Sequence, residues 1–286
     1  MATLRIGTCS WKYPSWKGLV YSSGRGIDFL AEYARLYSTV EIDQWFWSLH
    51  GPDSITLPKS TVVREYAAAT PKDFVFTVKA PNSVTLTHAY RKNASMPLVR
   101  NEHFLSIDLF LRFIDTLEPI RDKLGPLMLQ FEYLNREKMP SLSAFLDQLS
   151  SFLSHCPREL AIGIETRNPN YLKKEYFGVL DEYGAHHVYL QGYYMPPIID
   201  VYTKHASHAP SRSVLRLHGP DRAGMEKRSG GRWDTLLEKR DEELASIAAM
   251  VSQLLQRNID VFVNVNNHYE GSAPLTIQRF RDAMQT

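Results

Sequence analysis

The sequence predicts a single-domain (β/α)8 TIM barrel that spans residues 1–286. Eight short runs rich in β-branched residues recur along the chain, and longer stretches with apolar residues at intervals of three and four separate most of them. Strand followed by helix, repeated, is typical of parallel strands joined by right-handed crossovers, which can close into a barrel. An open doubly wound sheet is the alternative, but no Gly-x-Gly-x-x-Gly turn follows any of the runs.

The elements can be placed along the chain from these patterns. The expected strands are residues 4–9, 39–42, 74–79, 126–131, 160–165, 187–191, 214–218 and 260–265. Helical spacing covers residues 27–37, 104–117, 142–153, 175–184, 241–256 and 273–284. Residues 51–72 are loop-rich, and prolines within residues 192–213 stand where the sixth helix is due. We expect both stretches to be loops of the active site, since no repeat or linker divides the chain.

The composition limits the classes of function. Hydrophobic residues make up 44% of the chain and charged residues 22%, which is ordinary for a globular protein. A net charge of +2 gives no general electrostatic reason to bind nucleic acid or an anionic membrane, although it does not exclude a local basic patch. Cys9 and Cys156 have no metal-ligand spacing, so we expect neither a disulfide nor a zinc site. Without a signal-like start or a long apolar run, we expect a cytoplasmic protein that does not enter a membrane; its oligomeric state stays open.

Polar residues stand at the end of nearly every expected strand. In a parallel barrel these ends converge on one face, where polar side chains point into a common bowl above the packed core. We therefore expect a site for a small polar or anionic ligand there. The candidates are Trp11, Glu41, Asp43, Lys79, Gln130, Glu165, Arg167, Gln191, Arg216, His218, Asn264, Asn266, Asn267 and His268, with Trp16 and His88 in the adjoining loops.

Several ordered segments also resemble the signature segments of the domain of unknown function 72 family. They are "GTCSWKYPSWKGLVY", "LAEYARLYSTVEI", "TPKDFVFTVKAP" followed by "LTH", "LGPLMLQF", "ETRNPNY", "LRLHG" and "VFVNVNNHYEGSAP". The resemblance covers nearly the whole chain and implies a TIM-barrel fold, but it implies no reaction. The sequence departs from the family pattern at "DQWFW", where Asp43 replaces the usual Asn, and after Gln130, where Phe-Glu-Tyr replaces the usual prolines.

Charged residues at the strand ends predict acid–base chemistry. Glu165 and Arg167 are two residues apart and so lie on one face of a strand, as do Arg216 and His218. We expect Glu41, Glu165 and His218 to act as catalytic acid and base, and Arg167 or Arg216 to hold an anionic group. The structural alternative is that these charges form salt bridges that hold the barrel mouth together.

Histidines and amides leave further roles open. His88 and His268 could join the catalytic set as ligands of Zn or Mn, although no His-x-His or His-Glu-x-x-His motif occurs. Asn266 and Asn267 suit the orientation of a polyol, a base edge or a carbonyl oxygen, or they hold neighbouring loops. Cys9 is a candidate nucleophile if a base lies beside it, and otherwise a small buried strand residue.

Aromatic and basic loop residues allow two interpretations. Trp11 and Trp16 could stack on a sugar or, with Lys12, Lys17 and Arg25 nearby, on a nucleobase; otherwise they pack a loop onto the barrel. The glycines and cations of residues 218–233 could accept a phosphate, the alternative being a mobile solvated loop.

Three functional hypotheses follow. The first is an enzyme of the hydrolase or lyase type that acts on a sugar, nucleotide or phosphoester at the barrel mouth. The second is a metal-dependent phosphoesterase or nuclease, and the third is a non-catalytic barrel that binds nucleic acid or a regulatory ligand. The many inward polar groups favour the first hypothesis, while the cofactor and the substrate stay unknown.

Overall fold

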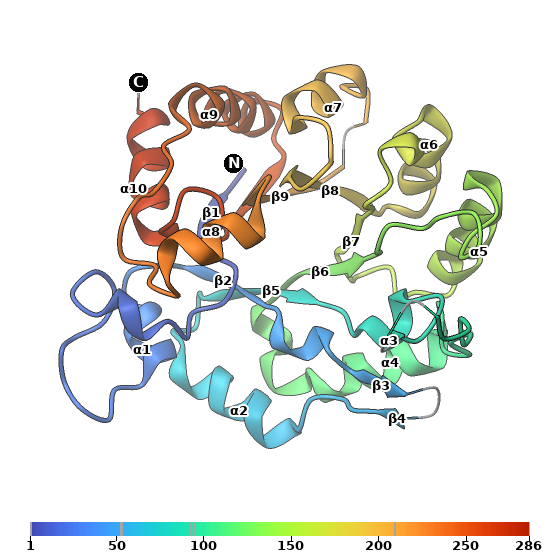
Figure 1. The fold of residues 1–286 in the computed structure, drawn as a ribbon, viewed down its shortest axis with the longest axis horizontal. Helices are drawn as coiled ribbons and strands as arrows, with labels where there is room; N and C mark the ends of the chain where they lie inside the picture. Colours follow the sequence, from blue (N-terminus) through green and yellow to red (C-terminus); the bar gives the residue numbers. More distant parts are fainter. Residues whose placement is uncertain (1, 52–53, 92, 94, 209, 286) are drawn as a thin grey trace.

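The computed structural model describes residues 2–51, 54–91, 93, 95–208 and 210–285, and it forms a parallel barrel ringed by helices (Figure 1). The barrel strands are β1 (Leu4–Thr8), β2 (Thr39–Ile42), β5 (Val75–Lys79), β6 (Leu124–Gln130), β7 (Ile162–Glu165), β8 (His186–Gly192), β9 (Arg212–Gly219) and β10 (Asp260–Val265). They pair in parallel in the order β1-β10-β9-β8-β7-β6-β5-β2. Every run that the sequence predicted as a strand overlaps one of these strands, and the predicted fold class is confirmed.

The two ends of this sheet, β1 and β2, lie side by side and are joined by backbone pairing at the C-terminal face. The Ser10 amide donates to the Glu41 carbonyl at 3.1 Å, and Cys9 forms an isolated parallel bridge with Glu41. The other neighbouring strands form continuous ladders, so this short contact nearly closes the ring. Glu41 therefore belongs both to the closure of the barrel and to its C-terminal face, which we call the mouth; the opposite face is the lower end.

Helices cover the outside of the barrel. They are α1 (Phe29–Tyr33), α2 (Ser60–Ala69), α4 (Ile107–Thr116), α5 (Leu142–Ser154), α6 (Lys174–Tyr183), α7 (Ile198–Lys204), α9 (Asp241–Gln256) and α10 (Ala273–Ala283). The remaining connections hold α3 (Asn82–Thr85), α8 (Arg222–Ser229), the hairpin of β3 (Leu49–Gly51) and β4 (Ser54–Ile55), and the 3-10 turns η1 (Pro14–Trp16), η2 (Gln44–Phe46), η3 (Glu118–Lys123) and η4 (Pro169–Tyr171). No helix among the described residues is long and apolar enough to cross a membrane.

Three stretches that we expected to be loops contain helices. Within residues 192–213, α7 begins directly after Pro197, a position where proline fits because the first helical amides have no intrahelical partner. Residues 51–72 contain α2 and part of the β3–β4 hairpin, and residues 218–233 contain α8, whose cap Asp221 accepts from the Gly224 amide at 2.8 Å. Residues 52, 53 and 209 of these stretches lie outside the described residues. In Figure 1, α8 crosses in front of the barrel strands.

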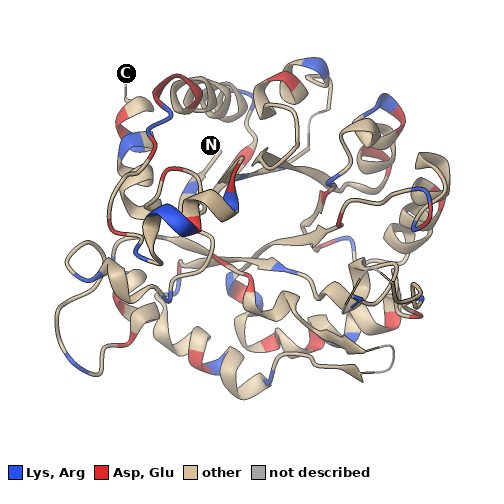
Figure 2. Ribbon diagram, in the orientation of Figure 1, with Lys and Arg blue, Asp and Glu red and all other residues tan. Residues whose placement is uncertain are grey.

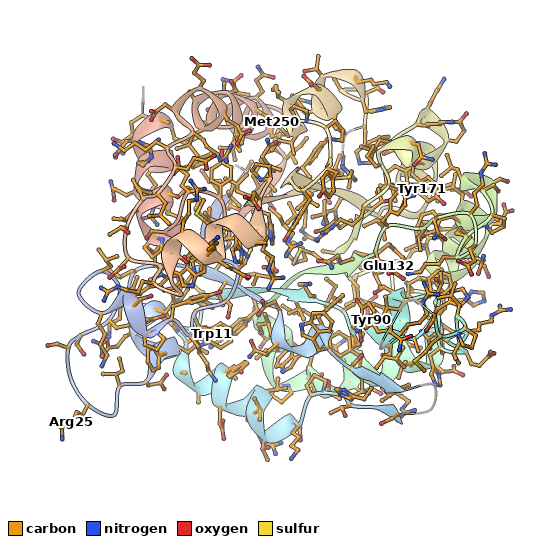
Figure 3. All side chains as sticks on the ribbon, in the orientation of Figure 1. Trp11, Arg25, Tyr90, Glu132, Tyr171 and Met250 are labelled. Carbon is orange, nitrogen blue, oxygen red and sulfur yellow. The ribbon has the colours of Figure 1, made fainter. Side chains whose placement is uncertain are left out.

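Apolar side chains fill the barrel and the layer between the strands and the helices. All four residues of β2 are buried, and α9 buries a single face that includes Ile247, Met250 and Leu254 (Figure 3). Inside the barrel Asn264 of β10 donates to Thr77 of β5 at 3.0 Å. These strands are not neighbours in the sheet, so this hydrogen bond crosses the interior and satisfies two buried polar groups.

Candidate functional site

Arg216 lies at the centre of the mouth and joins two buried carboxylates. Its Nε donates to Glu41 Oε2 at 2.8 Å and its Nη2 to Glu41 Oε1 at 2.6 Å, which makes a bidentate pair between β9 and β2. Its Nη1 donates to Glu165 Oε2 and, at 3.2 Å, to Gln130 Oε1. Both carboxylates are fully buried and Arg216 is 2% exposed. We call Glu41, Glu165 and Arg216 the charged floor; Figure 2 shows charged residues on the strands at the centre of the ring as well as on the outer helices.

The charges of the floor stabilise one another. Burial alone would raise the pKa of Glu165, but Arg216 and Arg167 outweigh burial and lower that pKa to about 2. Burial also opposes the charge of Arg216, yet Glu165 and Glu41 raise its pKa well above the ordinary value. Glu165 is therefore ionised at neutral pH and has no proton to donate. The structural alternative, in which the charges hold the mouth together, describes the geometry of Glu41 and Glu165.

Arg167 extends the floor toward solvent. Its Nε donates to Glu165 Oε1 at 2.8 Å, and its guanidinium carbon lies 4.3 Å from the centroid of the Tyr193 ring. The side chain is 22% exposed, and its terminal Nη groups have no hydrogen-bond partner among the described residues. Because guanidinium groups bind carboxylates and phosphates through paired N–H donors, Arg167 can receive an anionic group that enters the mouth.

His218 lies between Tyr193 and Cys9. Its Nδ1 is 3.1 Å from the Tyr193 hydroxyl and its Nε2 is 3.7 Å from Cys9 Sγ. Burial, together with Arg216 and Arg167, holds the pKa of His218 well below its usual range, so the imidazole is neutral at pH 7. Burial and the neighbouring Glu41 raise the pKa of the Cys9 thiol, which keeps the sulfur protonated despite the adjacent histidine.

Lys79 ends β5 beside the floor. It is 9% exposed, and its Nζ lies 4.0 Å from the centroid of the Phe46 ring. Its ammonium forms no hydrogen bond or ion pair with any residue that the structure describes. Burial and the nearby Arg216 lower the pKa of Lys79 to about 8, against the attraction of three carboxylates, those of Glu41, Glu165 and Asp43.

Asp43 follows β2 and lies half-buried above the floor. Burial and the negative charge of Glu41 raise its pKa, while Lys79 and Arg216 lower it by less. Burial raises the pKa of Tyr13 too, and its hydroxyl donates to the Cys9 carbonyl at 3.4 Å. The surroundings of Asp43 thus favour its protonated form, a property that its position in place of the usual Asn did not reveal.

The amides that end β10 mainly build the loop before α10. The Asn266 side chain accepts from the His268 amide at 3.0 Å, and the Asn267 side chain accepts from the Ala273 amide at 2.9 Å. His268 faces α8, with Nε2 3.2 Å from Glu226 Oε1. The buried Asn267 Nδ2 has no partner among the described hydrogen bonds, so this amide alone keeps an open donor.

The two tryptophans of the first loop lie inside the protein. Trp11 is 1% exposed and packs edge-on against Tyr66 of α2, near which Figure 3 places it. Trp16 is fully buried and donates from Nε1 to the Trp233 carbonyl at 2.9 Å. Arg25, a cation that we associated with nucleobase stacking, lies on a loop that projects away from the barrel (Figure 3). These positions match the alternative in which the tryptophans pack a loop onto the barrel.

His88 and Gln191 lie away from the floor. His88 Nδ1 contacts Thr87 Oγ1 at 3.0 Å. Burial and the nearby Lys138 lower the pKa of His88, and Glu132 acts in the opposite direction. Gln191 points outward and donates to Glu243 of α9 at 2.6 Å. Among the described residues, no group of three or more His, Cys, Asp or Glu side chains could hold a metal ion, so the metal-dependent hypothesis has no ligand set there.

Tyr193 is the site residue that the sequence patterns did not single out. It joins Arg167 to His218, and its backbone has a positive φ of 53°. Ser10, after β1, also has a positive φ, at 77°. Such conformations cost about 1–2 kcal/mol for residues with a Cβ, and they cluster where function constrains the backbone. The only available signal was the position of Tyr193 directly after a glycine at a strand end.

Known proteins are similar to this chain in sequence and in fold. The family described as "Protein of unknown function DUF72" matches residues 5–286. The chain belongs to the DUF72 family. The UPF0759 protein YecE of Escherichia coli K12 is 28% identical over 170 residues, which are 59% of this chain and 50% of that protein. The chain thus aligns with about half the length of the curated relatives that it matches.

Two solved DUF72 structures have the same architecture. The DUF72 protein of Enterococcus faecalis V583 aligns with a TM-score of 0.68 at 19% identity, covering 99% of this chain and 96% of that chain. The DUF72 protein of Thermotoga maritima MSB8 gives 0.66 at 24% identity, with 99% and 100% covered. These likenesses establish the barrel and leave the reaction to be inferred from the site.

Proposed function

We propose that this DUF72 protein is an enzyme of the hydrolase or lyase type that acts on a small, polar, anionic substrate at the barrel mouth. In this proposal Arg167 binds the anionic group. Asp43, Lys79 and His218 surround the reacting atoms and transfer protons, while Glu165 of the charged floor holds Arg167 in position.

The observation that carries the proposal is a contrast among the cations of the mouth. Arg216 is saturated by Glu41 and Glu165, and its charge is neutralised within the floor. Lys79 and the Nη groups of Arg167 keep unpaired N–H donors beside it. These donors, on a largely buried lysine and a half-buried arginine, remain available to a ligand that enters the mouth.

Acid–base roles follow from the protonation states. Glu165 stays ionised because Arg216 lowers its pKa, so it fits a charge-balancing role better than the role of a proton donor. Asp43 has a raised pKa and Lys79 a pKa of about 8, which brings both toward the range that general acid–base catalysis requires. Neutral His218 can accept a proton, with Tyr193 fixing its ring.

The test is an activity screen with matched variants. Purified protein is assayed against 2-oxo acids, phosphomonoesters, carboxylic esters and glycosides, and any active substrate is retested with Arg167→Met, Lys79→Met and Arg121→Met. Arg121 is an exposed cation paired with Glu118 at 3.3 Å on η3 and serves as the control. We expect turnover of an anionic substrate, a KM raised about tenfold or more in Arg167→Met, and no change in Arg121→Met.

A different outcome would favour another hypothesis. Absence of turnover across the panel, together with a salt-dependent affinity for an oligonucleotide, would support the non-catalytic binding barrel and contradict the proposal.

A further inference from the structure

The lysine of the mouth is an unusual residue for a stable protein. Lysine is almost never fully buried unless a counter-ion holds it, yet Lys79 is 9% exposed and has only the face of Phe46 against its ammonium. Two of the three nearby carboxylates are engaged elsewhere, since Glu41 and Glu165 bind Arg216, and the third, Asp43, forms no ion pair with Lys79 among the described residues. A lysine in this state has lost part of its hydration without gaining an ion pair among the described residues.

The surroundings of Lys79 favour the neutral amine. Burial of the side chain against the Phe46 ring removes part of the hydration of the ammonium, and Arg216, a fixed cation on β9, repels it. The charged groups that act on Lys79 from the other elements are Glu41, Glu165 and Asp43, and their attraction is smaller than the combined effect of burial and Arg216. Desolvation beside a second cation is the way in which proteins turn lysine into a nucleophile.

We propose that Lys79 forms an imine with the substrate, and that the substrate is a small aldehyde or ketone that carries a carboxylate or phosphate. This inference rests on the proposed function and deepens it by naming the nucleophile and the substrate class.

The chemistry balances without any further reagent. The Lys79 lone pair adds to the carbonyl carbon, and one Nζ proton passes to the carbonyl oxygen, which gives a carbinolamine. The hydroxyl leaves as water with a proton from the Asp43 carboxyl, so Asp43 becomes a carboxylate and an iminium remains. In a C–C cleavage the bond beside the iminium carbon breaks, and its electron pair forms an enamine. The released fragment leaves as an aldehyde, and its hydroxyl proton passes to the Asp43 carboxylate. Asp43 returns this proton to the enamine carbon. One water molecule then hydrolyses the iminium, which releases the carbonyl product and the neutral Lys79 amine, and the proton set free restores the Asp43 carboxyl.

The position of Arg167 limits the substrate to anionic carbonyl compounds. Arg167 and Lys79 both influence the pKa of Glu165 after burial and Arg216, and that of His218 likewise, so the two cations lie around the same pair of residues. A carboxylate or phosphate on the Nη groups of Arg167 would leave the other end of a short substrate for Lys79.

Lys123 provides a matched control within the same chain. Burial lowers its pKa too, but its Nζ donates to the Ala67 and Thr70 carbonyls at 2.7 Å each and to Thr70 Oγ1 at 3.0 Å. All of its donors are used, so we expect it to react slowly with carbonyl compounds. Lys123 is half-buried, so the comparison contrasts a lysine whose donors are all used with one that has no partner among the described residues.

The experiment is reductive trapping on the full chain. The protein is incubated with pyruvate, glyoxylate or acetaldehyde and sodium cyanoborohydride, and modified lysines are located by peptide mass spectrometry. We expect one dominant adduct on Lys79, its loss in Lys79→Arg and Lys79→Met, and its retention in Lys123→Arg. Arg167→Met should reduce trapping of pyruvate about tenfold and leave trapping of acetaldehyde unchanged. Circular dichroism of each variant establishes that it is folded.

Two further measurements test the reactivity of Lys79 and the binding of the substrate separately. Limited reductive methylation with formaldehyde, a probe too small to be excluded by shape, should modify Lys79 before surface lysines. Modification of Lys123 or of surface lysines at the same rate would overturn the proposal. Calorimetric titration with pyruvate separates the two ideas: binding that depends on Arg167 without trapping would overturn the imine alone, whereas neither binding nor turnover would overturn the proposed function as well.

Discussion

Lys79 and Lys123 lie at opposite ends of the barrel and show how differently the two ends treat a buried charge. Lys123 precedes β6 at the lower end and caps the last turn of α2, where carbonyls without intrahelical partners need a donor. Lys79 ends β5 at the mouth and has no such partner among the described residues. One lysine has every donor satisfied by the main chain and a hydroxyl, and the other is left without a partner among the described residues.

Other charged side chains at the two ends of the barrel also differ in the partners that they bind. At the lower end Arg5 donates to the Ser38 and Asp73 carbonyls at 3.2 and 3.1 Å, and Asp260 accepts from the Thr3 amide and hydroxyl at 2.8 Å. A cavity of about 580 Å³ opens there, with Arg5 and Asp260 in its lining. At the mouth, charged side chains bind one another instead of the main chain. Space alone therefore does not mark the functional end; unsatisfied and mutually dependent charges do.

The largest expected effect comes from breaking the floor. Arg216→Met leaves two buried carboxylates without a cation, and we expect a loss of about 3–5 kcal/mol of unfolding free energy in urea titrations. Arg121→Met, at the exposed ion pair of the lower end, should change it by less than about 0.5 kcal/mol. Adding Glu41→Gln and Glu165→Gln to Arg216→Met should restore much of the loss. A stable single variant would show that the floor is hydrated.

The second prediction concerns how the contribution of Glu165 to stability changes with pH. The folded pKa of Glu165, about 2, lies below its ordinary value of 4.5, so its contribution is present above pH 4.5 and is lost as the pH falls toward 2. Glu165→Gln should therefore cost on the order of 3 kcal/mol at pH 7, and the difference from the wild type should narrow between pH 4.5 and 2. Urea titrations at pH 7, 4 and 3 measure it. The exposed control Glu118→Gln should show no such convergence.

The third prediction compares the two ends of β8. Gly192, at the mouth, has a φ of +124°, and a Cβ there would lie 2.2 Å from the Gly219 carbonyl oxygen. Gly184, before β8, has a φ of +67° and nothing within 4 Å of a Cβ. We expect Gly192→Ala to cost about 2–3 kcal/mol and Gly184→Ala about 1 kcal/mol, because only the first adds a steric clash with a neighbouring strand. Equal costs in thermal unfolding would contradict the close approach of β8 and β9.

The smallest expected effect is on the free energy of unfolding, and it has opposite signs for the two lysines, Lys79 at the mouth and Lys123 at the lower end. At neutral pH the charged Lys79 opposes folding, because its folded pKa of about 8 lies below the ordinary 10.5; wild-type stability should accordingly rise between pH 8 and 10.5. Lys79→Met should then be more stable by about 1–2 kcal/mol at pH 7. Lys123→Met, which removes hydrogen bonds to α2, should be less stable by about 1–2 kcal/mol. Destabilisation of Lys79→Met would indicate a counter-ion for its ammonium.

Much of the fold could be predicted from the sequence because its signals are local. A buried parallel strand needs a short apolar run, and an amphipathic helix needs apolar residues on one face, so the order of elements can be recognised along the chain. Short helices were missed where the local signal is weak. In α7 and α8 a proline or several glycines accompany the helix, and the packing of the loop decides the conformation.

The sequence by itself determined that charged residues such as Glu41, Glu165 and Arg216 end the barrel strands, since a polar residue that follows an apolar strand leaves the core there. Only the tertiary structure decided how these residues combine. Glu41 and Arg216 are 175 positions apart, and their pairing depends on the strand register and the closure of the ring. Whether a carboxylate is neutralised or a lysine is left without a partner depends on burial and on distances between strands, and neither quantity is encoded in any one segment of the chain.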